Sequence, residues 1–149
     1  MNKILIAYDG SDSSNAALSG LLRAGLPETV EAMVLSVADV WLPPGGEIDF
    51  DEQGLPGEIR RARHKALESL RHCGDLAEKA RARLERSFPE WELRAVASAG
   101  PFPATIQAVA REWRADLVVV GADQRSALRR WLSGNFSKKV VSLAPCSVY

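Results

Sequence analysis

The sequence is poor in the residues that usually carry metal or redox chemistry. It holds two cysteines and two histidines in 149 residues. Cys73 and Cys146 lie far apart, and neither forms a metal-like cluster with the histidines. We therefore expect reduced thiols and no metal site. Basic and acidic residues balance at 19 each, so overall charge gives no reason to expect nucleic acid or an anionic membrane as a partner.

Long hydrophobic runs and the best-known nucleotide motifs are also missing. No apolar run approaches a transmembrane helix in length, and no signal peptide precedes the first apolar run, so we expect a cytoplasmic protein. There is no G-x-x-x-x-G-K-[ST] and no G-x-G-x-x-G after the first predicted strand. There is also no G-x-S-x-G. These absences argue against P-loop proteins, dinucleotide folds and serine hydrolases. His64 and His72 are interpreted as solvent-facing residues.

Predicted strands and helices alternate along the whole chain. Apolar runs predict strands at Lys3–Tyr8, Glu31–Val40, Trp91–Ala99, Leu117–Val120 and Ser147–Tyr149. Apolar residues three and four apart predict a helix capped by Ser11 or Asp12 and ended by Gly25 and Pro27, and further helices over about Glu58–Phe88, Pro103–Trp113 and Asn135–Leu143. Strands that are apolar without strict alternation are buried on both faces. The chain is thus predicted to be a single α/β domain, a three-layer, Rossmann-like sandwich with a five-stranded parallel sheet.

Two features surround the long predicted helix. Trp41 to Gly57, rich in Gly, Pro and acidic residues, predicts a long acidic loop that is mobile or lid-like. The helix has one basic face, which we interpret as solvated surface, and Gly74 would allow a bend. Its apolar stripe comprises Ile59, Ala62, Ala66, Leu70, Cys73, Ala77, Ala80 and Leu84.

The stretch from 117 to 136 is the most informative one for function. It runs from a strand through Gly121 and a basic loop to Gly134 and a helix start. Two such glycines can bring backbone N–H groups up to a phosphate. Ligands of parallel α/β sheets bind beyond the carboxyl ends of the strands, and Asp9 follows another of those ends. The alternatives are turn geometry for the glycines, a capping or turn role for Asp9, and an ordinary solvated surface for Arg125, Arg129 and Arg130.

The sequence resembles the universal stress protein family over essentially the whole chain, residues 1–149. Four segments carry the resemblance: KILIAYDGS, LSVAD, AGPFPATIQAVAREWRADLVVVGA and SGNFSKKVVSLAPCSV. It implies a five-stranded parallel sheet of the adenine nucleotide α-hydrolase type and a ligand that is ATP or AMP, with or without Mg²⁺. It also implies a homodimer formed through the last strand, and an unidentified downstream protein as partner. The short C-terminus puts this dimer strand in doubt, and two alternatives stay open: a truncated chain or a different dimer.

The family's glycine motif, G-x2-G-x9-G-[ST], is matched at two of four positions. Gly121 and Gly134 match, whereas Gln124 and Asn135 replace a glycine and a Ser or Thr. If the second glycine needs a positive φ, Gln124 costs about 1–2 kcal/mol. Asn135 is milder, because its amide can donate to a phosphate and Asn is a good helix N-cap. The resemblance further places Ala7, Val37 and Val120 around the base, Asp9 near the adenine and ribose, and Phe136 and Ser137 directly after the motif. The basic side chains of Arg125, Arg129 and Arg130 are candidates to add positive charge near the phosphates.

Three functional hypotheses follow. The first is a non-enzymatic, adenine-nucleotide-binding regulator of the stress response. The second is a nucleotide-free dimeric interaction module of the same fold, suggested by the two substitutions in the motif. The third is an enzyme of the adenine nucleotide α-hydrolase group. The sequence argues against it, because S-G-G-x-D-S and H-x-G-H are absent and no residue is an evident nucleophile or base, although slow ATP hydrolysis stays conceivable.

Overall fold

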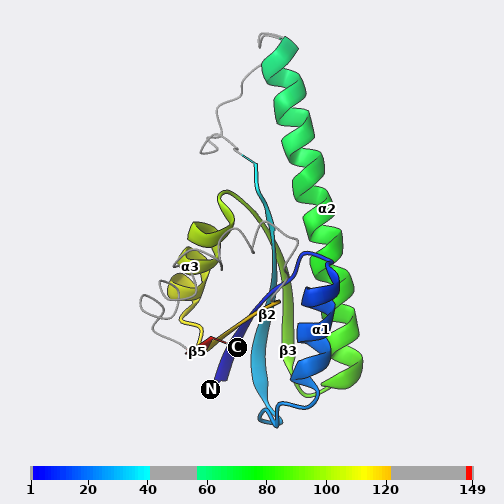
Figure 1. Ribbon diagram of the computed structural model, residues 1–149, viewed down its shortest axis with the longest axis vertical. Coiled ribbons are helices and arrows are strands. Elements are labelled where there is room, and N and C mark those ends of the chain that lie inside the picture. The colour runs from blue at the N-terminus through cyan, green and yellow to red at the C-terminus, as the bar shows by residue number, and fades with distance from the viewer. Residues whose placement is uncertain (1, 41–56, 122–146, 149) are drawn as a thin grey trace.

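The strands form one parallel sheet in the order β3-β2-β1-β4-β5 (Figure 1). The computed structural model describes residues 2–40, 57–121 and 147–148, so the predicted loop over 41–56 and the predicted last helix lie outside the described residues. The strands are β1 (Asn2–Ala7), β2 (Val30–Ala38), β3 (Glu92–Ala99), β4 (Leu117–Val120) and β5 (Ser147–Val148). All the pairings are parallel. The predicted five-stranded sheet is confirmed, and two residues of its fifth strand are among those described.

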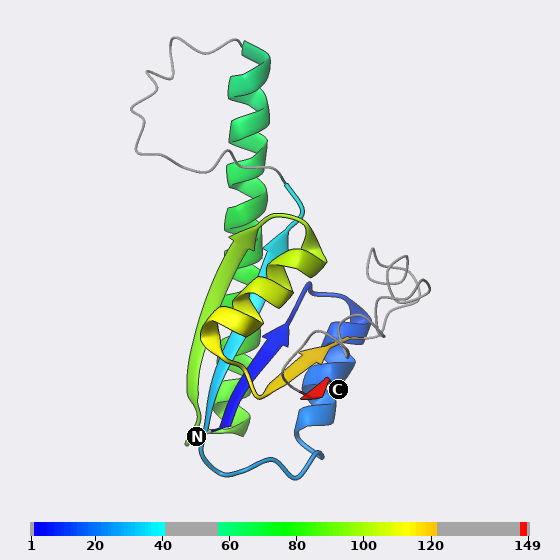
Figure 2. The same cartoon turned by 90° about the vertical axis from the view of Figure 1, so that its left-hand side faces the viewer.

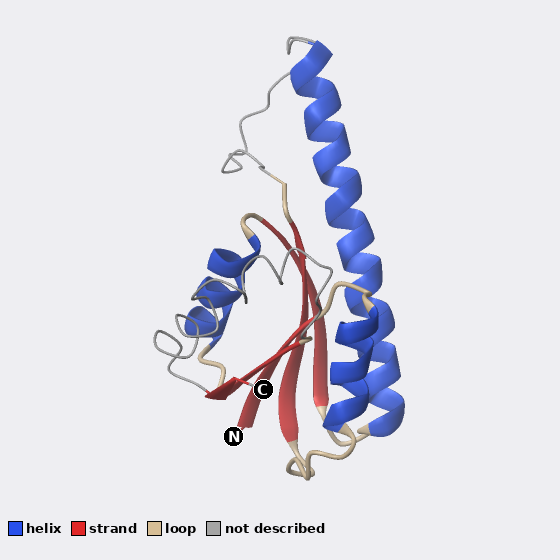
Figure 3. Ribbon diagram, viewed as in Figure 1, coloured by secondary structure: helices blue, strands red, loops and turns tan. Residues whose placement is uncertain are grey.

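Helices cover both faces of the sheet. The helices α1 (Asp12–Leu21) and α2 (Gly57–Ser87) lie on one face, and α3 (Phe102–Trp113) lies on the other (Figures 2 and 3). Successive side chains of a strand point to opposite faces. Accordingly, Ile4 and Ile6 of β1 join a core cluster with α1 and α2. Leu5 and Ala7 join a second cluster with α3. The predicted three-layer α/β architecture is therefore confirmed.

Burial follows the position of each strand in the sheet. The central strands β1, β2 and β4 are apolar runs that contribute to both clusters, as expected for parallel strands covered on both faces. The strand β3 lies at an edge, and its Glu92 and Arg94 are exposed. Charged side chains on an edge strand disfavour pairing with another chain.

The helix α1 begins as predicted and ends earlier than predicted. Ser11 is its N-cap, and its side chain accepts a hydrogen bond from the backbone of Ser14. The sequence predicted an end at Gly25 and Pro27, but the helix ends at Leu21. Leu22, directly after the helix, is 53% exposed. The helix thus stops at Leu21, its last core residue, before Gly25 is reached. Turns then lead the chain towards β2.

The helix α2 extends well beyond the sheet (Figure 1). Its 31 residues correspond to a length of about 46 Å, whereas the longest strand, β2, has 9 residues and spans about 30 Å. The predicted apolar stripe is therefore buried only in part: Ala66, Ala77, Ala80 and Leu84 are buried, and Ile59 is 51% exposed. The helix is continuous through Gly74. A Cβ on Gly74 would lie 3.9 Å from that of Ala97 in β3.

Candidate functional site

The order of the strands reverses between β1 and β4. From β1 the chain builds β2 and β3 on one side, and it then returns to build β4 and β5 on the other. Where the connections on the two sides diverge, a parallel sheet leaves a crevice beyond the carboxyl ends of its strands. The register places Ala7 directly beside Val120 at these ends. This pair marks the expected ligand site.

Three apolar residues predicted to surround a base lie together at this edge. Ala7 is paired with Val120 on one side and with Leu35 of β2 on the other. Val37 lies two residues further along β2, so its side chain points to the same face of the sheet as that of Leu35. Ala7 belongs to the core cluster on the α3 face, and half-buried Val37 and Val120 pack against that cluster. A partly open apolar surface of this kind suits the flat face of a base.

The turn between β1 and α1 presents Asp9 at the same edge. Gly10 has φ +79°, a left-handed conformation that glycine adopts without steric cost. Asp9 is exposed, and its Oδ1 accepts a hydrogen bond of 2.9 Å from the backbone N–H of Ser11. This bond makes an Asx turn. The turn role that the sequence left open for Asp9 is thus present in the structure, and it uses one of the two carboxylate oxygens.

The first turn of α1 is fixed by its own serines. Ser11 Oγ accepts from the backbone N–H of Ser14 at 3.2 Å, and Ser14 Oγ donates to the carbonyl of Ser11 at 3.0 Å. The hydroxyls of Ser11 and Ser13 are 3.1 Å apart. Ser14 is only 3% exposed, so these bonds satisfy a buried polar group.

Gly121 allows the end of β4 to approach this turn of α1. A Cβ built on Gly121 would lie 2.6 Å from the backbone nitrogen of Ser14, and 2.7 and 2.8 Å from the carbonyl carbon and oxygen of Ser13. Its φ lies outside the left-handed region. A positive φ therefore does not explain the glycine at position 121, whereas close packing against α1 does. That packing brings the end of β4 next to the helix that follows Asp9.

The phosphate side of the predicted site stays a prediction. Its residues lie outside the described part of the chain: Gln124, Arg125, Gly134, Asn135, Phe136 and Ser137. Within the described residues, no three His, Cys, Asp or Glu side chains are grouped to hold a metal ion. In the same residues no helix is both long and apolar enough to cross a membrane.

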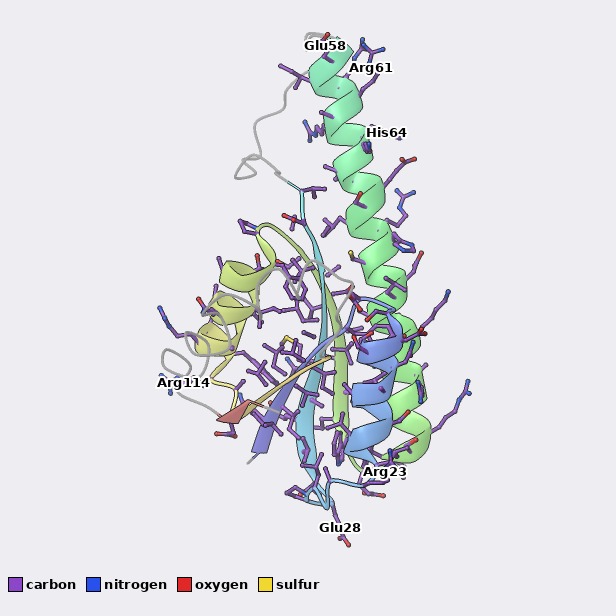
Figure 4. The ribbon with its side chains drawn as sticks, in the orientation of Figure 1. Arg23, Glu28, Glu58, Arg61, His64 and Arg114 are labelled. Carbon is purple, nitrogen blue, oxygen red and sulfur yellow. The ribbon has the colours of Figure 1, made fainter. Side chains whose placement is uncertain are left out.

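The two histidines are exposed on α2, as the sequence predicted. His64 Nε2 lies 3.2 Å from Glu68 Oε1, one helical turn away. Figure 4 shows His64 on the part of α2 that extends beyond the sheet. Neither histidine belongs to the candidate site.

The sequence did not reveal the residues that brace the Asp9 turn. Asn15 of α1 bonds to backbone carbonyls of the turn, to the hydroxyl of Tyr8 and to Arg83 of α2. The only local signal is an amide side chain four residues after the N-cap, where it can reach back to the turn. The contact with Arg83 joins residues 68 positions apart, and no periodicity in the sequence indicates it.

The fold and this edge define a doubly wound parallel α/β domain with a candidate ligand crevice between β1 and β4. The model of the universal stress protein family matches residues 1–149, and the chain belongs to that family. No curated protein matches the sequence.

Solved structures of similar proteins share the fold. The hypothetical protein MJ0577 is 16% identical with a TM-score of 0.72, over 99% of this chain and 92% of that one. The universal stress protein UspA from Lactobacillus plantarum is 21% identical with a TM-score of 0.68, over 99% and 95%. The universal stress protein family protein At3g01520 from Arabidopsis thaliana, solved with AMP bound, is 18% identical with a TM-score of 0.62, over 100% and 90%. At such identities the likeness establishes the fold.

Proposed function

We propose that this chain binds an adenine nucleotide, ATP or AMP, in the crevice between β1 and β4, and that it acts as a non-enzymatic regulator in the stress response. The observation that carries the proposal is the meeting of Ala7 and Val120 at the point where the strand order reverses. The Asp9 turn and Gly121 flank this pair. The relative from Arabidopsis thaliana, which holds AMP on the same fold, supports the choice of ligand.

Each part of the site has a distinct role in this proposal. Ala7, Val37 and Val120 form an apolar wall for the adenine, and the free oxygen of Asp9 accepts hydrogen bonds from the ribose or the base. Mg²⁺ would enter with the phosphates, whose oxygens it prefers as ligands. The phosphates themselves would be held by the segment after β4, through Gly121, Gln124, Arg125, Gly134, Asn135, Phe136 and Ser137.

Replacing Asp9 by Asn tests the proposal. In Asp9→Asn the amide oxygen can still accept from the N–H of Ser11, so the Asx turn survives while the charge and the second carboxylate acceptor are lost. A lost hydrogen bond to a charged group is worth about 1.5–3 kcal/mol. We therefore expect affinity for ATP and AMP, measured by isothermal titration calorimetry, to fall by about tenfold or more, with little change in unfolding.

Asp116→Asn is the matched control. Asp116 Oδ2 also accepts a backbone N–H, from Lys3 at 2.8 Å, but it precedes β4 and thus lies at the amino end of the strands. Its replacement should leave nucleotide affinity unchanged. Absence of binding at millimolar ATP and AMP would refute the proposal, and an equal loss in both variants would refute the role of Asp9.

The nucleotide-free interaction module is the second candidate. Two observations favour it: Asp9 already serves the turn, and Gly121 already serves the packing of α1 against β4. The fold would therefore use both residues even if no nucleotide ever bound. Mass spectrometry of small molecules released from the purified protein separates the candidates. An adenine nucleotide supports the first, whereas ligand-free protein that takes up no added ATP supports the second.

We further propose a cytoplasmic homodimer that acts on an unidentified downstream protein, without nucleic acid or membrane as partner. The position of β5 at the edge of the sheet supports pairing between two copies. Analytical ultracentrifugation of the full chain would measure the oligomeric state.

A further inference from the structure

One side chain, Asn15, holds the Asp9 turn from the helix side. Its Nδ2 donates to the carbonyl of Ser11 at 3.1 Å and lies 3.5 Å from the carbonyl of Gly10. The Asx turn fixes Asp9 relative to Ser11, and the bonds of Ser14 hold Ser11 on α1. The amide of Asn15 adds a restraint that extends beyond α1.

The other end of the same amide is anchored on two further elements. Asn15 Oδ1 accepts from the hydroxyl of Tyr8, just after β1, at 2.9 Å, and from Nη1 of Arg83 in α2 at 3.2 Å. Arg83 Nη2 also donates to Ser19 Oγ of α1 at 2.8 Å. Both the donor and the acceptor atoms of the amide are therefore used, and the turn is connected through one side chain to β1, α1 and α2.

We propose that Asn15 is a positioning residue for the nucleotide site, which holds Asp9 in place beside the apolar wall of the crevice. This inference rests on the proposed function. Asp9 is exposed, so packing does little to restrain it. A carboxylate that is already held in its binding geometry loses less conformational freedom when a ligand binds, and affinity rises accordingly.

Asn15→Asp separates this role from general stabilisation. The carboxylate can still accept from Tyr8 and Arg83, but it has no N–H to donate to the turn. We expect affinity for adenosine to fall by about tenfold while the unfolding midpoint stays close to that of the unaltered protein. Adenosine is the probe because it carries no phosphate that the new negative charge would repel.

Ser19→Ala is the matched control on the same helix. It removes the bond from Arg83 Nη2 to Ser19 and leaves both ends of the Asn15 amide intact. We expect a lower unfolding midpoint with unchanged affinity for adenosine. If Asn15 had only a structural role, both variants would show a lower unfolding midpoint and an unchanged affinity for adenosine.

Amide hydrogen exchange of Ser11 in the ligand-free protein supplies an independent measurement. Its N–H donates to Asp9, and we expect it to exchange faster in Asn15→Asp but not in Ser19→Ala. Unchanged exchange would overturn the inference, as would unchanged adenosine affinity in Asn15→Asp. If the unaltered protein binds neither adenosine nor ATP, the proposed function fails, and the nucleotide role of Asn15 fails with it.

Discussion

Gly121→Ala should destabilise the protein, because the space for its side chain is already taken. The added Cβ would lie 2.6 Å from the backbone nitrogen of Ser14, and 2.7 and 2.8 Å from the carbonyl carbon and oxygen of Ser13. These are backbone atoms of the first turn of α1, so no side chain can rotate out of the way. Either α1 or the end of β4 must move.

The size of the effect follows from opposing terms. Burying one methyl group contributes about 0.8 kcal/mol, whereas forcing extra volume into a packed site usually costs about 1–3 kcal/mol in total. For a chain of this length each kcal/mol shifts Tm by about 2–4 °C. We therefore expect Tm to fall by about 2–12 °C. Urea denaturation followed by the fluorescence of the four tryptophans would give the free energy of unfolding, with an unchanged m-value.

Gly20→Ala is the control that separates packing from the general effect of adding a methyl group. Gly20 lies in α1, and apart from its chain neighbours and the backbone of its own helical turns, no described atom lies within 4 Å of its hypothetical Cβ. Alanine in a helix is favoured over glycine by about 0.5–1 kcal/mol, so this variant should be more stable than the unaltered protein. A Gly121→Ala variant as stable as the unaltered protein would refute the packing argument.

Two further predictions concern the motif and pH. Changing Gln124 to Gly and Asn135 to Ser should tighten ATP binding, by about tenfold for the first, in calorimetric titration; unchanged affinity would refute our account of the motif. A hydrogen bond from Arg81 lowers the pKa of Glu78 from its ordinary value of 4.5. The bond therefore stabilises the folded protein at pH values above 4.5. This contribution to stability is lost as the pH falls through the lowered pKa. Glu78→Gln should therefore slightly reduce Tm at pH 7 but not at the acid end of the range, and an equal difference at both would contradict the assignment.

Most of the fold could be predicted because burial leaves a local signal in the sequence. The run Leu117–Val120 is apolar throughout and became β4 with the predicted bounds. The end of α1 was placed too late, because Gly25 and Pro27 show where a helix must stop and not where its packing ends. The first turns of α2 were predicted as buried for a related reason. A 3.6-residue period shows that a face can pack, but it carries no information on the length of the sheet beneath it.

In the candidate site, too, one part could be predicted from the sequence and another could not. The placement of Ala7, Val37 and Val120 at one edge could be predicted, since the carboxyl ends of parallel strands share an edge. The restraints on the Asp9 turn could not, because the bond between Asn15 and Arg83 joins residues 68 positions apart. The approach of Gly121 to Ser13 and Ser14 is equally non-local. Contacts of this kind are created by the packing of α1, and no spacing or motif in the sequence records them.

The structural roles of Gly121 and Asp9 weaken these two residues as evidence for a bound nucleotide. Gly121 is required wherever β4 packs this closely on α1, and a side-chain oxygen such as that of Asp9 is required wherever this Asx turn begins the helix. A relative that had lost its nucleotide would keep both residues for stability, so their presence is weak evidence for a ligand. A stronger test uses chemical groups that folding does not need. These are the second oxygen of Asp9 and the donors expected after β4, and Asp9→Asn, which preserves the turn, measures the first of them directly.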